Sequence, residues 1–126
     1  MTPGQYILVV DDDDDFREAL GEVLTGAGYP VQQAENGEVA LRRVAEEAPG
    51  IVLLDLKMPV LDGWGVMERM RADARTAAVP ILILSAYGFE WEAELLGAQG
   101  YISKSVGMDE ILDRVRKAAG PPPMRH

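Results

Sequence analysis

The segment Tyr6-Ile7-Leu8-Val9-Val10-Asp11-Asp12 joins a run of apolar and aromatic residues directly to two acids. Three later apolar runs have the same design and end at Asp55, Ser85 and Lys104. Unbroken Ile, Val and Leu runs are typical of parallel strands that are covered on both faces. The carboxyl ends of such strands lie along one edge of the sheet, where open α/β sheets bind their ligands. We therefore expect the two acids, Asp55, Ser85 and Lys104 to converge at one site.

Helical patterns alternate with these strands along the chain. Apolar residues recur at helical spacing after the first strand as far as Gly28, and Val31–Ala34 reads as a short second strand. Five strand–helix units in 126 residues predict an α/β fold with a doubly wound, five-stranded parallel sheet. The later helices are predicted over residues 38–48, 64–71 and 90–96 and from Asp109, the expected N-cap of the last helix.

Composition limits what this domain can do. The net charge is -9, with five acids together at residues 11–15, which argues against binding nucleic acid through its phosphates. The chain has no cysteine, so disulfides, thiolate zinc sites and cysteine nucleophiles are excluded. No apolar run approaches the ~20 residues of a membrane span. The first residues also lack the basic start of a signal peptide, so a cytoplasmic location is expected.

The acids at the predicted sheet edge call for a counterion. Two carboxylates ~4 Å apart repel each other by roughly 4 kcal/mol at an effective dielectric constant of about 20. Asp11, Asp12 and Asp55 therefore either keep a proton or recruit a hard cation, and Mg²⁺ suits such a site because it takes a few carboxylates and keeps water and phosphate oxygens. Residues 13–15 are expected to be helix-start acids that favour the helix dipole.

A calcium loop is a second interpretation of the same acids. Asp11, Asp13, Asp15 and Glu22 stand at the first, third, fifth and twelfth positions of an EF-hand pattern. The sixth position requires glycine for its sharp turn, and here it is Phe16. The preceding residues also read as a strand instead of a helix, so this interpretation is the weaker one.

A third interpretation makes the first acids catalytic. A strand followed by Asp-x-Asp is similar to the nucleophile motif of haloacid-dehalogenase-type phosphatases, with Asp11 as nucleophile and Asp13 as acid. That family usually continues with Thr or Val, whereas this chain continues with Asp14 and Asp15. It also usually needs a cap or a longer core.

A longer motif is much more specific. Residues 55–63 read Asp-Leu-Lys-Met-Pro-Val-Leu-Asp-Gly, and they combine with an acidic pair near the N-terminus, Ser85 thirty residues later and Lys104 after a strand. With these motifs, residues 6–119 resemble the receiver domain of two-component response regulators, the CheY-like family. The resemblance implies a flavodoxin-like (βα)5 fold with strand order 2-1-3-4-5.

Outside that region, residues 1–5 are expected to be an N-terminal extension. Residues 120–126 are expected to be a flexible, proline-rich tail.

The resemblance implies a phosphoryl site with a metal. Asp55 matches the family's phosphoacceptor, which takes a phosphoryl group from the phosphohistidine of a sensor histidine kinase or a phosphotransfer protein. Asp12, Asp55 and the backbone carbonyl of Lys57 match ligands of Mg²⁺, and Asp11 matches an acid that supports the metal through water.

The same resemblance implies a switch. Ser85 matches the hydroxyl that moves to hydrogen-bond the phosphoryl oxygens, and Lys104 matches the lysine that pairs with the phosphoryl group. Tyr101 matches the aromatic residue that turns inward behind the hydroxyl. A phosphoryl group brings ~1.5 to 2 negative charges, so a local electrostatic event can bias a two-state element.

Two features depart from the family pattern, and a third position bears on the lifetime of the phosphorylated state. Lys104 precedes Ser105 where the family usually has a proline after a cis peptide, which puts the reach of Lys104 in question. The interval from Ser85 to Lys104 is 19 residues, about three shorter than usual, so we expect a shortened or irregular fourth helix and an unusual partner surface. Tyr87 is expected to shield an acyl phosphate and slow its hydrolysis.

The resulting expectation is a stand-alone response regulator receiver in a two-component phosphorelay. Such a protein is a switch, not an enzyme, and signals by binding a downstream protein in trans. Two alternatives remain: a receiver-like interaction module that phosphorylation no longer controls, and the small phosphatase with Asp11 as nucleophile.

Overall fold

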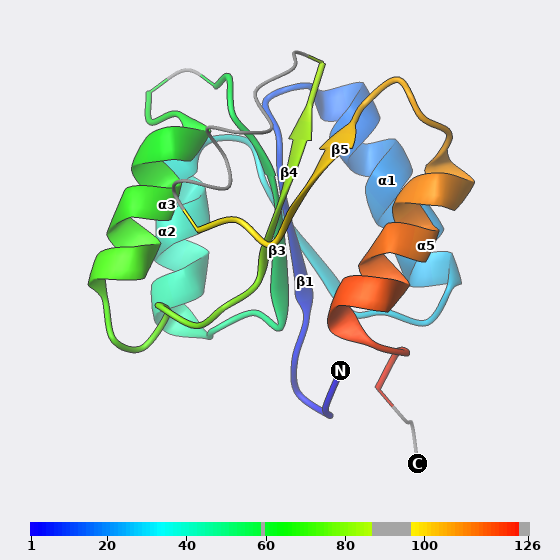
Figure 1. Cartoon of the computed structure of the whole chain (residues 1–126), viewed down its shortest axis with the longest axis horizontal. Helices are drawn as coiled ribbons and strands as arrows, with labels where there is room; N and C mark the ends of the chain where they lie inside the picture. The colour runs from blue at the N-terminus through cyan, green and yellow to red at the C-terminus, as the bar shows by residue number, and fades with distance from the viewer. Residues whose placement is uncertain (59, 87–96, 124–126) are drawn as a thin grey trace.

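The computed structural model describes residues 1–58, 60–86 and 97–123 and shows one parallel sheet between two layers of helices (Figure 1). The five strands have the order β2-β1-β3-β4-β5, and all neighbouring pairs are parallel. This confirms the predicted doubly wound fold. The strands are β1 (Ile7–Val10), β2 (Val31–Ala34), β3 (Ile51–Asp55), β4 (Ile81–Ser85) and β5 (Gly100–Ser103). The helices are α1 (Asp14–Gly26), α2 (Gly37–Glu46), α3 (Gly63–Ala72) and α5 (Met108–Ala119).

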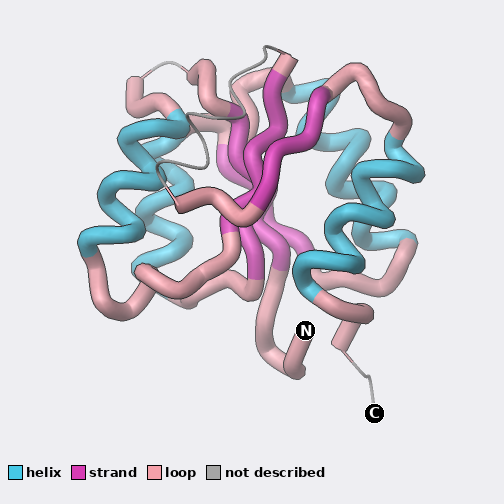
Figure 2. Tube along the Cα trace, in the orientation of Figure 1, coloured by secondary structure: helices cyan, strands magenta, loops and turns pink. Residues whose placement is uncertain are grey.

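The helices cover the two faces of the sheet in pairs, with α2 and α3 on one side and α1 and α5 on the other (Figures 1 and 2). Alternate residues of each central strand feed the two cores. In β1, Leu8 and Val10 pack with the α2–α3 layer, whereas Ile7 and Val9 pack with the α1–α5 layer. Because both of their faces are buried, the central strands β1, β3 and β4 carry no polar residue until their carboxyl ends. The sheet edge is therefore where polar groups gather.

Three of the four described helices begin at a side chain that accepts a backbone N–H. Asp13, Asn36 and Asp62 cap α1, α2 and α3 in this way. Asp109 was expected to cap the last helix, and that prediction is wrong. Gly107 is the N-cap of α5, and Asp109 lies in the first turn, where its charge favours the helix dipole without forming a cap hydrogen bond.

The loop from β3 to α3 has a tight geometry beneath the sheet edge. A Cβ atom on Gly63 would collide with the backbone carbonyl oxygen of Asp55, and the Gly63 N–H donates to the Leu56 carbonyl oxygen at 3.0 Å. Only glycine permits this close approach of two backbones. In the same loop Val60 has a φ of 71° and a side chain that is 72% exposed. A β-branched residue in the left-handed region is strained.

Two sequence-based expectations fall outside the described residues. The shortened fourth helix and the shielding role of Tyr87 both concern residues 87–96, so both stay predictions. In the part of the chain that the structure does describe, no helix combines the length and the apolar character needed to cross a lipid bilayer.

Candidate phosphoryl and metal site

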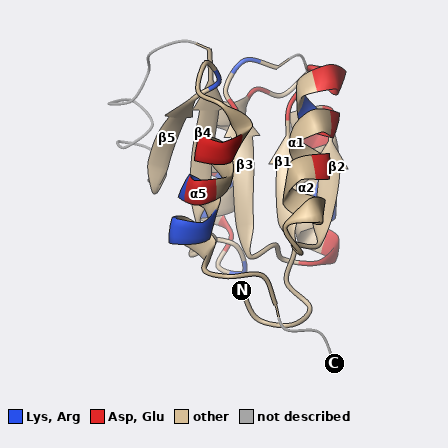
Figure 3. Cartoon of the chain, turned by 90° about the vertical axis from the view of Figure 1, so that its right-hand side faces the viewer, with Lys and Arg blue, Asp and Glu red and all other residues tan. Residues whose placement is uncertain are grey.

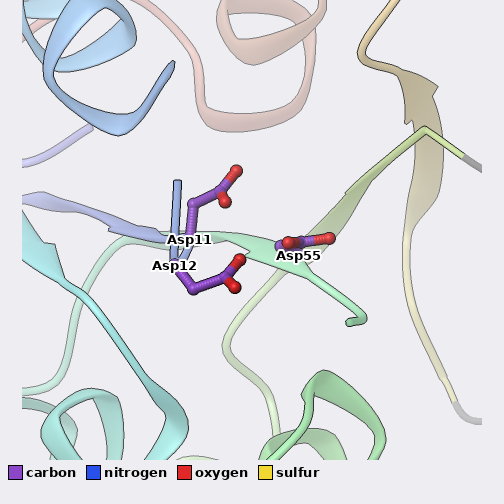
Figure 4. Close-up of side chains that lie close together, drawn as sticks. All are labelled: Asp11, Asp12 and Asp55. Carbon is purple, nitrogen blue, oxygen red and sulfur yellow. The ribbon is translucent and has the colours of Figure 1, made fainter. Parts of the chain in front are cut away.

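The register of the sheet brings the first acids together. Val10 of β1 pairs with Leu54 of β3, so the residues that follow, Asp11 and Asp55, are neighbours at the carboxyl edge. Asp11 is fully buried and Asp55 is 5% exposed, whereas Asp12 is exposed at the surface. Carboxylate oxygens of the three residues lie within 4.8 Å of one another (Figure 4). The convergence that the sequence predicted for these acids is present.

The register places the other two groups on the same edge. Ser85 at the end of β4 pairs with Ser103 of β5, and the Lys104 N–H donates to the Ser85 carbonyl oxygen at 3.0 Å. Ser85 is buried, and Lys104 is the first residue beyond β5. Ser85 and Lys104 therefore end two adjacent strands beside the acids.

Lys104 reaches the acids. Its Nζ lies 2.6 Å from Asp11 Oδ2 and 3.4 Å from Asp55 Oδ2, and the lysine side chain is 18% exposed. The Lys104–Ser105 peptide is trans, as are the other described peptide bonds. The turn after Lys104 is held instead by serines, because the Ser105 N–H donates to Ser103 Oγ at 3.2 Å and the two hydroxyls lie 2.7 Å apart. Ser105 in place of the family's proline therefore does not keep Lys104 from reaching the acids in this structure.

Burial and charge set the ionisation of the site. Burial, and after it the neighbouring Asp11 carboxylate, raise the pKa of Asp55 to about 6, although Lys104 and the Lys57 N–H oppose the increase. Burial pulls the pKa of Lys104 down. The hydrogen bond and charge of Asp11, together with Asp55, outweigh burial and leave the pKa of Lys104 above its usual value. Lys104 therefore stays charged, and Asp55 is ionised in most molecules at neutral pH.

A shallow cavity of about 450 Å³ opens beside these acids. It gives solvent and small ligands access from the side of Asp12. Its lining residues are Asp12, Leu56, Lys57, Met58, Asp62 and Trp64.

Hydrogen bonds from the start of α1 hold the loop that presents Asp11 and Asp12. Asp11 Oδ1 accepts the Asp13 N–H at 2.9 Å, and the buried guanidinium of Arg17 donates to the Asp11 carbonyl oxygen at 2.8 Å. The same guanidinium donates to Gln33 of β2 and pairs with Asp14. Asp13 to Asp15 therefore serve the helix start, as expected, with Asp13 as the cap and the other two in the first turn.

Arg17 was not identified from the sequence. A signal was present, since residues 17, 20, 21 and 24 have the spacing of one helix face and are all buried in α1. A charged residue on a core-facing stripe needs a buried acceptor, and the carbonyl of an acidic loop is one.

Tyr101, the expected switch aromatic, is half-buried on β5 and packs against the core of the α2–α3 layer. Its carbonyl oxygen accepts a hydrogen bond from Arg114 Nη2 at 3.2 Å, which ties β5 to α5. The side chain thus lies on the sheet face beneath the site.

The calcium-loop interpretation is wrong for this fold. Asp11 follows a strand, and Asp15 and Glu22 both lie inside α1, so the residues cannot surround one ion in a continuous loop.

Comparisons with known proteins agree with this geometry. The family model described as the response regulator receiver domain matches residues 7–116. The chain is 40% identical over 116 residues to sporulation initiation phosphotransferase F of Bacillus subtilis, covering 90% of this chain and 92% of that protein. It is 37% identical over 113 residues to the DNA-binding dual master transcriptional regulator RpaA of Synechocystis sp., covering 87% of this chain but 47% of that protein.

Solved structures give the same result. The receiver domain of sensor histidine kinase PA1611 from Pseudomonas aeruginosa PAO1, determined with a magnesium ion coordinated in its active-site cleft, matches with a TM-score of 0.83. The two are 28% identical, over 93% of this chain and 98% of that one. The chain belongs to the response regulator receiver domain family of two-component systems, and its sheet order is that of the CheY-like flavodoxin fold. It spans about half the length of several relatives, RpaA among them.

Proposed function

We propose that this chain accepts a phosphoryl group on Asp55 in a Mg²⁺-dependent reaction and then signals by binding another protein. The observation that carries the proposal is the position of the Asp55 carboxylate. It lies at the sheet edge between two further acids and the Lys104 ammonium, which is 3.4 Å from Asp55 Oδ2. An acceptor carboxylate with a cation beside it is what phosphoryl transfer needs from a protein.

The donor set fits Mg²⁺. Oxygen ligands from a few carboxylates are what this ion prefers, and the exposed Asp12 beside the cavity leaves room for water and phosphate oxygens. Asp12, Asp55 and the Lys57 carbonyl would hold the ion directly, and Asp11 would act through water. When bound, the ion neutralises charge on the transferring group.

Each protein group has a separate task in this proposal. Asp55 supplies the attacking oxygen, and Lys104 supplies a positive charge near the phosphoryl oxygens. Ser85 supplies a hydroxyl at the end of the neighbouring strand, and Tyr101 follows its movement. Because the transition state is loose, these residues act through position and charge.

A histidine kinase or phosphotransfer protein is the donor that we propose. The similarity to sporulation initiation phosphotransferase F over 92% of that protein supports a receiver that works in a relay. We further propose that it works in the cytoplasm, stands alone, and reaches its downstream partner in trans. It then acts as a switch and not as an enzyme.

The uncoupled interaction module is the second candidate. One reason for it was that Ser105 could remove Lys104 from the site, yet Lys104 contacts both acids. The phosphatase is disfavoured by burial, because the Asp11 side chain is fully buried and paired with Lys104 instead of open to a substrate.

One labelling experiment separates the three candidates. The full chain is incubated with MgCl₂ and phosphoramidate, and any acyl phosphate is located by peptide mass spectrometry. We expect one phosphoryl group on Asp55. It should not form when Mg²⁺ is chelated before phosphoramidate is added, and it should be absent from Asp55→Asn. No label on the wild-type chain would support the uncoupled module, and label on Asp11 with continued turnover would support the phosphatase.

A further inference from the structure

The Lys104 ammonium has an aromatic partner as well as two acids. Its Nζ lies 4.9 Å from the centroid of the Phe16 ring, in addition to its contacts with Asp11 at 2.6 Å and Asp55 at 3.4 Å. Ammonium groups within about 6 Å of a ring centroid are attracted by the negative face of the ring. The attraction is stronger where solvent is excluded, and the Lys104 side chain is only 18% exposed.

The Phe16 ring is held independently of Lys104. Phe16 lies in the first turn of α1, and its N–H donates to the capping Asp13 side chain at 3.2 Å. The ring is half-buried and packs against the core of the α1–α5 layer. It therefore has a fixed position from which it can hold a mobile group.

Lys104 needs such a support in this chain. Its long side chain has many rotamers, and the turn that follows it depends on the hydrogen bonds of Ser103 and Ser105. The shorter of its two ion-pair contacts is to Asp11, which draws the ammonium away from the proposed acceptor. The ring attracts the ammonium without carrying charge, so its pull persists when Asp55 becomes an acyl phosphate.

We propose that Phe16 is a positioning residue for Lys104, holding its ammonium where it can meet the phosphoryl group on Asp55. This inference rests on the proposed function, since it assigns a role within the same reaction. Phe16 acts through Lys104 and does not itself touch the phosphoryl group.

The ring's electrostatics can be changed without changing its shape. The chain has two phenylalanines, Phe16 and Phe89. In a Phe89→Leu background, global incorporation of 3,4,5-trifluorophenylalanine alters position 16 alone and weakens the negative face of that ring. We expect the rate of Asp55 labelling by phosphoramidate and Mg²⁺ to fall about threefold to tenfold. The melting temperature should change little, because the ring keeps its packing.

Two matched proteins test whether the effect passes through Lys104. In Phe16→Leu, trifluorophenylalanine is incorporated only at position 89. The rate of Asp55 labelling in this protein should equal the rate in Phe16→Leu made without the fluorinated amino acid. In Lys104→Met with Phe89→Leu, fluorination of Phe16 should no longer alter the rate. A ring with a purely structural role would lose the same rate with and without Lys104, so it would show no coupling between positions 16 and 104.

Two results would overturn the inference. One is an unchanged rate after fluorination of Phe16 alone, and the other is an equal loss of rate with and without Lys104. Either leaves the proposed function standing, because Asp55 is still labelled in the unmodified chain. Failure of the proposed function is distinct, since the unmodified chain would then take no label on Asp55.

Discussion

Asp55 is held in a position that is unfavourable for a charge until a cation arrives. Burial and the Asp11 carboxylate raise its pKa to about 6, and Lys104 offsets this only in part. Carboxyl groups whose pKa is shifted by burial and by a neighbouring like charge are common at functional sites. The cost is borne by the metal-free fold and is removed by a bound cation or by protonation.

The sign of the pH dependence follows from this pKa. A carboxyl group whose pKa is higher in the folded state binds protons on folding, so its contribution to stability is full below the unfolded pKa and is lost as the pH rises through about 6. In EDTA, Asp55→Asn should therefore be more stable than wild type near pH 8, by on the order of 2 kcal/mol. The gap should narrow as the pH falls through about 6 and close only below the unfolded pKa of 3.8, near pH 3.5.

Urea unfolding at the two pH values measures this gap. Asp15→Asn, an exposed acid in the first turn of α1, is the matched control and should show no such gain. A gap that is absent near pH 8, or that grows as the pH falls, would contradict the proposed strain at Asp55.

Among the elements, the β3–α3 connection depends on a single glycine. The Cβ of an alanine at position 63 would meet the backbone carbonyl of Asp55, which can shift only at a cost because β3 is hydrogen-bonded between two strands. We expect Gly63→Ala to lower the free energy of unfolding by about 2 kcal/mol or more. It should also slow labelling of Asp55, since relief of the clash displaces the acceptor strand.

Gly26→Ala is the control for this substitution. Nothing lies within 4 Å of a Cβ atom at Gly26, at the end of α1, so the change should stabilise the chain by about 0.5 kcal/mol. Both free energies are measured by denaturant unfolding. If Gly63→Ala were as stable as wild type, the close approach in this loop would not exist.

The elements also show where sequence reasoning succeeds and where it stops. The strand at Val31–Ala34 was predicted with its observed bounds, because Pro30 before it and the Asn36-Gly37 pair after it are local turn signals. The helix predicted to reach Ala48 ends at Glu46, since Pro49 disfavours helical geometry in the residue before it. The cap at Gly107 was missed because glycine caps carry no side-chain signal.

Site contacts were harder to predict than site membership. The sequence indicated that Asp11, Asp55 and Lys104 meet, but not that Lys104 lies closer to Asp11 than to the acceptor. That preference depends on the reach of one side chain across the sheet edge. The roles of Arg17 and Phe16 depend likewise on the packing of α1 against the sheet beside β1 and β2, which no local sequence pattern predicts.

At the scale of the whole molecule, charge is unevenly arranged. Acidic residues lie along α1, which begins next to the site, while α5 carries both acidic and basic residues (Figure 3). A bound divalent cation relieves the repulsion among the acids at the sheet edge, and any ligand that binds only the folded state raises its stability. Mg²⁺ should therefore raise the melting temperature of the entire domain.

The exposed acid should govern this stabilisation. Asp12→Asn should weaken Mg²⁺ binding at least tenfold, since even the loss of a group that supports a metal ligand costs about 10- to 100-fold. The titration can follow Trp64, which lines the cavity with Asp12, in a Trp91→Phe background that leaves one tryptophan. Equal Mg²⁺ affinity in Asp12→Asn would remove this residue from the metal site.

A crystal structure of the chain with Mg²⁺ and beryllofluoride, a mimic of the phosphoryl group, tests most directly whether four strand ends form one site. We predict beryllium bonded to an Asp55 carboxylate oxygen, with the Lys104 ammonium and the Ser85 hydroxyl contacting its fluorides and Mg²⁺ on Asp12. Beryllofluoride bound to a different carboxylate, or Lys104 and Ser85 both turned away from it, would contradict the account.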